Sequence, residues 1–405
     1  MSYKANMKDV YYFSSSLSPL NDYWILKELL ENNISVKVID IYGLINDESK
    51  DIAVENTQVE FFKVCASVFE LDDVLVSIGF GQIVFAPAGG GISEKIRNDL
   101  TVKGVSVVCD TTYSLPIVSL SMKMGDNEHY NNPVLNVLRV FRTKGIGGFT
   151  RHCLDFMRAK FPFALTIEKK TSNDEKRREN TYLVTSGAKN HLAYPLVRDA
   201  YNQIKVGHFS VICRETKLKR VVSDDYWVFI DQAIPFHRDA KRVGVNYEPF
   251  ADGYYQSLIN FFKFVEESTN KKVIIALHPR TAESYASHFT GFDTYKGVTE
   301  ELIEYSDGII SHFSTCIYSA VYLKKPVVLI TNELMNMHHD VRRMYDFSER
   351  LNKSVIDIDK QTPYEFESHA DVDVIAYRHF EENYIKQSDA KDDKAINILR
   401  KKLNF

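Results

Sequence analysis

Short apolar runs alternate with helix-like patterns along the first quarter of the chain. A run at 10–13 precedes a segment, 20–33, whose apolar residues recur at helical spacing, and a second run follows at 34–42. The same order returns at 82–110, where a triple glycine at 89–91 comes before the helix pattern. Strands that alternate with helices in this way indicate a parallel sheet with helices on its faces.

The second half of the chain shows the alternation more cleanly. A strand pattern at 226–232 is followed by a long helical pattern at 252–270 and by a strand pattern at 271–280. Further elements follow in the same order: a helix at 299–306, a strand at 307–314, a helix at 315–325 and a strand at 326–331. This half predicts a second parallel sheet.

The segments between the two halves are less regular. Residues 113–160 have no clear period and are interpreted as an insertion in the first domain. The run 168–180 is strongly charged and predicts a solvated loop or a mobile lid. Segments 181–187 and 208–214 have the pattern of the last strands of the first domain, and 217–225 is a plausible hinge.

The length of 405 residues exceeds one ordinary domain and suits two. We predict an N-terminal Rossmann-like domain on the acceptor side over 1–220 and a C-terminal Rossmann-like domain on the nucleotide-sugar side over 221–375. A helical tail, 376–405, is a candidate to cross back to the first domain. Two doubly wound α/β halves joined by a hinge resemble the GT-B architecture, in which a cleft separates the two domains.

Composition narrows the class of protein. Hydrophobic residues make up 44% and charged residues 26%, which is typical of a soluble folded protein, and a net charge of −4 gives no global reason to bind nucleic acid. Five scattered cysteines with no CxxC pair predict reduced thiols and a cytoplasmic protein. The segment 395–405 mixes apolar and basic residues, so we expect it either to pack on its own domain or to rest on the inner face of the cytoplasmic membrane.

Polar residues at the carboxyl ends of the predicted strands are the first candidates for chemistry, because ligands of open α/β sheets bind there. In the second domain these residues are Asp231, His278, Ser311, His312, Ser314 and Thr315. Pro279 ends the strand that precedes it, so His278 is expected to face the crevice, with Arg280 adding a positive charge. A crevice histidine can donate to a phosphate oxygen; the alternative is that His278 only caps its strand.

A second candidate lies at a predicted helix start. Ser314 is expected as the N-cap of a helix over 315–323, whose first amides together with two hydroxyls would form a site for one phosphate. Ser314 could equally do no more than cap its helix. The presence of His278 one strand away in the same predicted sheet favours the functional interpretation.

These residues carry a family resemblance. The sequence LHPR at 277–280, followed by HFST at 312–315, a helix and KKPVVL at 324–329, resembles the HP and Ser/Thr motifs of bacterial sialyltransferases, polysialyltransferases and β-Kdo transferases. The resemblance covers about 231–331. It implies that His278, Ser314 and Thr315 contact the phosphate of a CMP-activated sugar.

Those families also use an acidic residue, often in a D/E-D/E-G motif ahead of the HP motif. This chain has no such triplet, and its nearest match is Ala-Asp-Gly at Asp252 and Gly253. Asp231 is preferred, because it ends a predicted strand whereas Asp252 begins a predicted helix. By resemblance to the β-Kdo transferases Asp231 would be a nucleophile; in an inverting enzyme it would be a general base.

The first domain offers further candidates. Gly89, Gly90 and Gly91 would let the backbone approach a ligand on that side of the cleft, or they form a plain turn. Asp110 ends a predicted strand and Glu168 follows another apolar run. Both are candidate acids or acceptor contacts in the cleft; the alternative for Glu168 is a carboxylate on a surface loop.

The resemblance implies a glycosyltransferase that moves a sialic acid, Kdo or similar acid from a CMP-sugar to a bacterial surface glycan, in lipopolysaccharide or capsule biosynthesis. CMP leaves as a monophosphate, which a histidine and a helix start can stabilise, so we expect no metal and no cofactor besides the donor. The alternatives are a CDP-polyol phosphotransferase, a UDP-sugar GT-B enzyme and, in another class, a non-catalytic nucleotide- or glycan-binding protein.

Overall fold

The computed structural model describes most of the chain. The described residues are 9–14, 24–45, 61–112, 172–193, 197, 199–208, 211, 217–237, 240, 244–279, 281–360, 366–390 and 393–405. All but the first residues of α6 belong to one compact unit, which comprises 1–118 and 176–405. Of the second unit, 119–175, only 172–175 are described.

Seven of the described strands form an entirely parallel N-terminal sheet in the order β3-β2-β1-β4-β5-β6-β7. Their bounds are β1 Val10–Ser14, β2 Val36–Asp40, β3 Phe61–Val64, β4 Ile83–Phe85, β5 Ser106–Asp110, β6 Thr181–Thr185 and β7 Asn202–Lys205. The strand order reverses between β1 and β4, so the sheet is doubly wound.

Six described strands form a second parallel sheet in the order β10-β9-β8-β11-β12-β13. Their bounds are β8 Tyr226–Ile230, β9 Lys272–Leu277, β10 Thr294–Lys296, β11 Gly308–Ser311, β12 Val327–Thr331 and β13 Val355–Asp357. Every residue of β8 is buried, as expected of a central parallel strand covered on both faces. The predicted pair of parallel sheets is confirmed.

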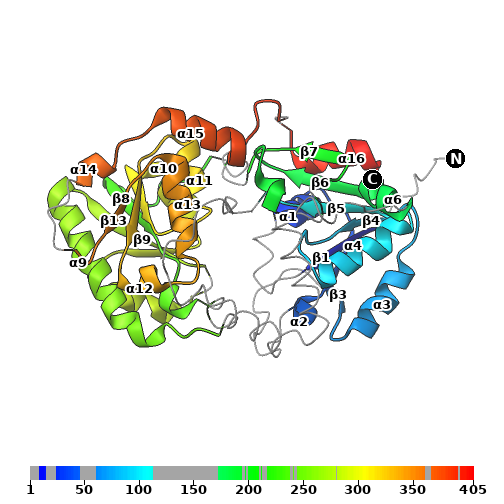
Figure 1. Ribbon diagram of the computed structural model, residues 1–405, viewed down its shortest axis with the longest axis horizontal. Coiled ribbons are helices and arrows are strands. Elements are labelled where there is room, and N and C mark those ends of the chain that lie inside the picture. Colours follow the sequence, from blue (N-terminus) through cyan, green and yellow to red (C-terminus); the bar gives the residue numbers. More distant parts are fainter. Residues whose placement is uncertain are drawn as a thin grey trace, which may run out of the picture. The chain divides into compact units, whose positions relative to one another are not determined.

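Helices cover both faces of each sheet (Figure 1). Around the N-terminal sheet lie α1 Trp24–Glu31, α2 Tyr42–Ile45, α3 Val68–Ser77, α4 Ile92–Val102, α6 Ser172–Asn180, the 3₁₀ turn η2 Asn190–Ala193 and α16 Ala395–Leu403. Around the C-terminal sheet lie the 3₁₀ helices η4 Ile234–Phe236, η5 Glu248–Phe250 and η6 Glu283–Phe289, the α-helices α9 Ala251–Thr269, α10 Thr299–Tyr305, α11 Ile317–Tyr322, α12 Glu333–Met337, α13 Val341–Leu351, α14 Phe366–His369 and α15 Val374–Phe380, and the π-helix η7 Glu381–Ile385.

The N-terminal sheet has a hydrophobic cluster on each face. Alternate residues of β1 point to opposite sides, so that Tyr11 joins one cluster and Tyr12 the other. The first cluster includes side chains of α3 and α4, and the second includes side chains of α1 together with Ile396 and Leu399 of α16. The last helix of the chain therefore packs on the first sheet, and burial of each such side chain contributes about 2 kcal/mol.

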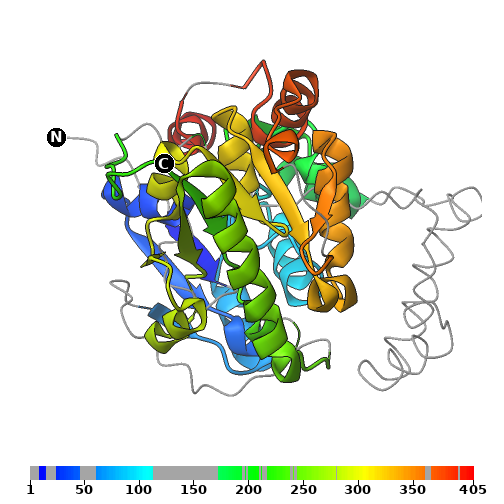
Figure 2. The same cartoon turned by 90° about the vertical axis from the view of Figure 1, so that its left-hand side faces the viewer.

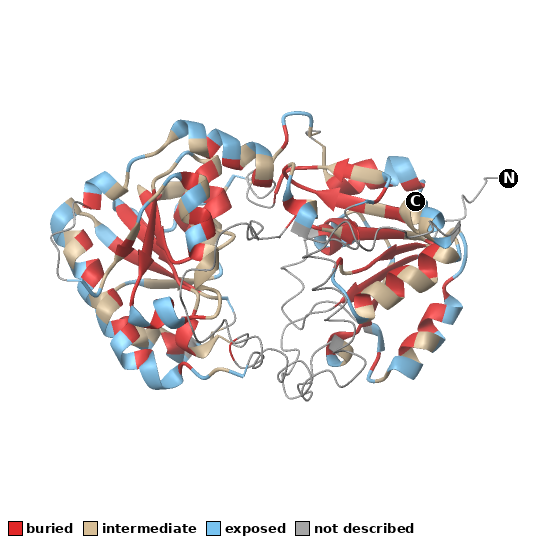
Figure 3. Cartoon of the chain, in the orientation of Figure 1, coloured by how far each residue is buried: buried red, intermediate tan, exposed pale blue. Residues whose placement is uncertain are grey.

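The C-terminal sheet has one large hydrophobic cluster. The long helix α9, which Figure 2 shows in light green along the sheet, contributes Tyr254, Leu258, Phe262 and Val265. These residues recur at helical spacing on one face. Figure 3 shows the same pattern in general: strands are buried, and helices are exposed on their outer faces.

Among the described helices, none has the length and apolar character needed to cross a bilayer.

The structure corrects two predicted elements. The charged run from Ser172 to Asn180 is the helix α6 and not a loop, since Glu, Lys and Arg are good helix formers even without an apolar stripe. The strand predicted at 208–214 is not found at its described residues, His208 and Val211; the last strand of the first sheet is β7, at Asn202–Lys205. The predicted insertion at 113–160 lies outside the described residues.

Candidate functional site

The candidate site begins at the point where the order of the second sheet reverses. Strand β8 lies between β9 and β11. The chain places its next strand, β9, on one side of β8 and the later strand β11 on the other side, so the strand order reverses at β8. Ligands of such sheets bind beyond the carboxyl ends of the strands at this point. The segments that follow β8 and β9 therefore define the region to examine.

Asp231 is the first residue after β8 and its side chain is only 3% exposed. One carboxylate oxygen, Oδ1, accepts from the Ala233 amide at 3.0 Å and from the Tyr285 hydroxyl at 3.3 Å. The other, Oδ2, accepts from the His278 amide at 3.3 Å. Burial raises the pKa of Asp231 to about 6, although these three hydrogen bonds act in the opposite direction.

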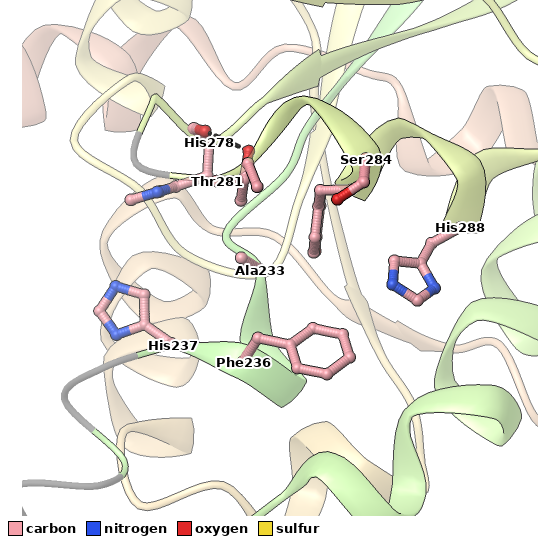
Figure 4. A pocket seen from close by; sticks show the side chains of 9 residues that line it. Ala233, Phe236, His237, His278, Thr281, Ser284 and His288 are labelled. Atoms are coloured by element: carbon pink, nitrogen blue, oxygen red, sulfur yellow. Dashed lines mark hydrogen bonds between the residues drawn. The ribbon is translucent and has the colours of Figure 1, made fainter.

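A cavity of about 290 Å³ lies beside this carboxylate. Its described lining consists of Ala233, Phe236, His237, His278, Thr281, Ala282, Ser284, Tyr285 and His288. Figure 4 shows the rings of His237 and His278 at one side of the cavity, His288 at the opposite side, and Phe236 between them. Asp231 is not part of this lining.

Two imidazoles form one end of the cavity. The ring centroids of His237 and His278 are 5.4 Å apart and the ring planes meet at 81°. His278 follows β9, and its carbonyl accepts from the amide and the hydroxyl of Thr281, at 3.1 and 2.8 Å. His278 thus lines a cavity at the strand end, as the Pro279 argument predicts, whereas Arg280 lies outside the described residues.

Aromatic rings form the other end. His288 stacks on Tyr255 with centroids 4.5 Å apart and on Phe236 with centroids 5.3 Å apart. Tyr285 meets Phe236 edge to face, and its hydroxyl is hydrogen bonded to that of Tyr255. The cavity therefore has a polar end with two imidazoles and an aromatic end.

Ser311 and His312 lie in the interior. Both are fully buried, and the His312 ring donates from Nδ1 to the Ile330 carbonyl at 2.7 Å while Nε2 accepts from the Tyr254 hydroxyl at 2.9 Å. Burial lowers the pKa of His312 to about 4, so its ring is neutral. The predicted nucleotide contact of these two residues is corrected, because His312 is held by protein partners on both ring nitrogens and neither residue lines the cavity.

Ser314 and Thr315 occupy a turn ahead of α11. The helix begins at Ile317, not at Thr315, and Ser314 Oγ accepts from the Cys316 amide at 3.2 Å. The amides of Ile317 and Tyr318 bond three residues back, to the carbonyls of Ser314 and Thr315, so the expected unpaired amides at this helix start are partly used. His278 and this turn lie beyond strands on either side of β8, and neither hydroxyl residue lines the cavity.

The N-terminal candidates have structural partners. Gly91, with φ of 61°, precedes α4 directly, and the Arg97 guanidinium donates to the carbonyls of Pro87 and Gly89, which fixes this glycine turn on its own helix. Asp110 ends β5 and accepts from the Thr112 amide at 2.8 Å. The exposed Gly90 lies between the other two glycines of the turn, and Glu168 lies outside the described residues.

Sequence reasoning found only His278 among the residues that line the cavity, and those it missed include Phe236, His237, Tyr285 and His288. For His237 a signal existed, since Pro235 just after a strand end predicts a loop at the ligand-binding edge. For Tyr285 and His288 there was none, because the side chains that a short 3₁₀ helix turns toward a cavity depend on its packing.

One described group could hold a metal ion, the neighbours His338, His339 and Asp340, whose ligand atoms lie within 4.8 Å of one another. His338 Nδ1, however, accepts from the Asp340 amide at 3.1 Å, which leaves the proton on Nε2. Nε2 is then a donor and not a ready metal ligand. These residues do not line the cavity described above.

Comparisons with known proteins agree on the fold. No family model and no curated protein matches the chain. Among solved structures, the wall teichoic acid polymerase TagF is similar with a TM-score of 0.51, 11% identity and coverage of 98% of this chain and 89% of that one. A glycotransferase of kitacinnamycin and a UDP-N-acetylglucosamine 2-epimerase have TM-scores of 0.48 and 0.47, each with 11% identity and coverage of 98% of this chain, and with coverage of 99% and 98% of their own chains.

At such low identity the likeness to TagF concerns the fold alone, and it agrees with the two doubly wound parallel sheets described above. The chain therefore has the α/β GT-B fold, built from two Rossmann-like domains.

Proposed function

We propose that this chain is a glycosyltransferase that transfers a sialic acid, Kdo or a similar sugar acid from a CMP-activated donor to a glycan acceptor. The observation that carries the proposal is the cavity after β8 and β9, with an imidazole pair at one end and aromatic rings at the other. A nucleoside monophosphate has the matching character: an anionic phosphate at one end and a flat base at the other.

The size and lining of the cavity support a monophosphate leaving group. At about 290 Å³ the cavity is at the small end of ligand pockets, a size that suits the nucleotide part of a donor and not a whole nucleotide sugar. Its described lining offers imidazoles and hydroxyls but no carboxylate, the ligand that Mg²⁺ prefers. We therefore expect turnover to survive EDTA.

In a direct displacement, the acceptor hydroxyl oxygen bonds to the anomeric carbon while the bond from that carbon to the phosphate oxygen breaks. The electron pair leaves with CMP, where His278 donates to the phosphate, and the acceptor proton passes to a carboxylate. Asp231 is poorly suited to that last role because it is buried and already accepts three hydrogen bonds. Asp231 instead positions the His278 strand end, and Asp110 and Glu168 remain the proposed bases.

The alternative is transfer of a polyol phosphate from a CDP-polyol, or of a sugar from a UDP donor. The wall teichoic acid polymerase among the similar structures keeps the first alternative open for this fold. The acceptor in our proposal is a bacterial surface glycan or glycolipid, reached in the cytoplasm at the inner face of the membrane.

The test is to incubate the purified chain with CMP-ulosonates, CDP-glycerol or UDP-N-acetylglucosamine in separate reactions, with and without EDTA, and to measure consumption of each donor. We expect the CMP-ulosonates alone to be consumed, and a loss of about 100-fold or more in His278→Ala with a normal melting temperature. His379→Ala is the matched control, because His379 is exposed on α15 and outside the cavity. Consumption of CDP-glycerol or of UDP-N-acetylglucosamine instead would replace the proposed donor, and nucleotide binding without turnover would favour a non-catalytic protein.

A further inference from the structure

His237 belongs to no motif that the sequence analysis singled out, yet it lines the same cavity as His278. It follows η4, whose carbonyl at Ile234 accepts from the His237 amide, while the His237 carbonyl accepts from the Ala240 amide at 3.1 Å. The backbone around this histidine is thus fixed on both sides. The His237 ring meets the His278 ring edge to face with centroids 5.4 Å apart.

One buried carboxylate ties together the segments that carry the two rings. Asp231 accepts from the His278 amide with Oδ2 and from the Ala233 amide with Oδ1. Ala233 has a φ of 50°, a left-handed conformation that alanine rarely adopts, and this residue turns the chain into the short helix that ends at His237. A conformation of this kind persists only where the surrounding structure holds it in place, and such residues cluster at active sites and ligand clamps.

We propose that His237 is a second phosphate-binding imidazole, which acts with His278 on the phosphate of the nucleotide while Asp231 sets the spacing of the pair. Two imidazoles this close repel each other when both are protonated, and a phosphate bound between them removes that repulsion. The pair thereby favours a phosphate monoester over an uncharged nucleoside. This inference rests on the proposed function in that it takes a nucleotide as the ligand.

The experiment compares each nucleotide with its own nucleoside. Binding of CMP, cytidine, UMP and uridine to the full chain is measured by calorimetry for the wild type and for His237→Ala, His237→Asn, His278→Ala and His288→Ala. For both His237 variants we expect CMP affinity to fall about 10-fold or more while cytidine affinity stays within twofold. His288→Ala is the matched contrast, since loss of an aromatic ring should weaken CMP and cytidine alike.

Equal losses for CMP and cytidine in the His237 variants, at wild-type melting temperature, would reduce His237 to a structural role and overturn the proposal. Wild-type affinity for CMP in both variants would overturn it as well. If UMP binds and CMP does not, the donor proposed above is wrong, but the ratio of UMP to uridine affinity still tests His237. Absence of binding to any of the four ligands would remove both proposals together.

Discussion

The two sheets share one topology but differ at the carboxyl ends of their strands. Beyond the C-terminal sheet lie Asp231 and His312, which are buried and hydrogen bonded and whose pKa values are shifted by burial. At the end of β5 in the N-terminal sheet, Asp110 is only partly buried and accepts one amide. Asp40 at the end of β2 is buried as well, but at the C-terminal edge the buried Asp231 lies beside the cavity, and ionisable groups with shifted pKa values concentrate at functional sites.

The hydrophobic packing around the two sheets also differs. Around the second sheet a single hydrophobic cluster joins the strands to α9, α11, α13 and α15, whereas the first sheet has a separate cluster on each face. This continuous cluster packs against the strands whose ends carry the cavity residues, so the packing of the C-terminal half sets the spacing of those residues.

The largest effect on stability is expected from adding a methyl group to the C-terminal core at Gly308. A Cβ at this position would lie 2.3 Å from the Trp227 ring and 2.9 Å from the Pro326 carbonyl, so Gly308→Ala should cost about 3 kcal/mol or more. Gly253→Ala is the control, because a Cβ there meets nothing within 4 Å and alanine favours the helix α9 by about 1 kcal/mol. The free energy of unfolding of both variants is measured by urea denaturation. Similar values would mean that the sheet shifts to make room for the added Cβ and that the packing contrast is weaker than described.

The second-largest effect is the loss of stability at low pH that follows from protonation of His312. The pKa of His312 is lowered to about 4, below its unfolded value, so its contribution to stability is present above pH 6.5 and is lost as the pH falls toward 4. This amounts to about 2 kcal/mol between pH 7 and pH 5. His312→Asn should be less stable at neutral pH but should lose less stability on acidification; an unchanged pH slope in urea titrations would contradict the buried neutral ring.

Asp231 should act in the opposite direction. Its pKa is raised to about 6, so its stabilising effect is present below the unfolded pKa near 4 and is lost as the pH rises through 6. From pH 5 to pH 7 the free energy of unfolding of the wild type should fall by about 1 kcal/mol relative to that of Asp231→Asn. A difference that does not change with pH would show that Asp231 is more accessible to water than its burial indicates.

The smallest effect is expected at the N-terminal edge. Asp110→Asn keeps the oxygen that accepts from Thr112, so the free energy of unfolding should change by less than about 0.5 kcal/mol at pH 7. A larger loss would erase the contrast between the two sheets. Turnover of the same variant reports separately on Asp110 as the proposed base.

The fold could be predicted largely from the sequence, because apolar periodicity determines helices and strands locally. The runs at 10–13 and 226–232 gave β1 and β8, and the pattern at 252–270 gave α9 within one residue at each end. The element α6 was missed because a charged segment carries no apolar period, although its residues favour a helix.

The candidate site could be predicted only in part. Strand-end reasoning pointed to Asp231 and His278, since the end of a strand can be read from a proline or a change of pattern. It gave His312 the wrong environment, because the pattern cannot tell a ring that faces a ligand from one enclosed between Tyr254 and Ile330.

The sequence by itself determined two parallel α/β domains and a histidine at the end of a strand. The tertiary structure decided that His237, Phe236 and His288 share a cavity with His278, and that Asp231 lies beneath them as a buried acceptor. The physical reason is range: secondary structure follows from neighbours a few residues apart, whereas a cavity is formed by side chains about 50 residues apart that only the packing of the sheet brings together.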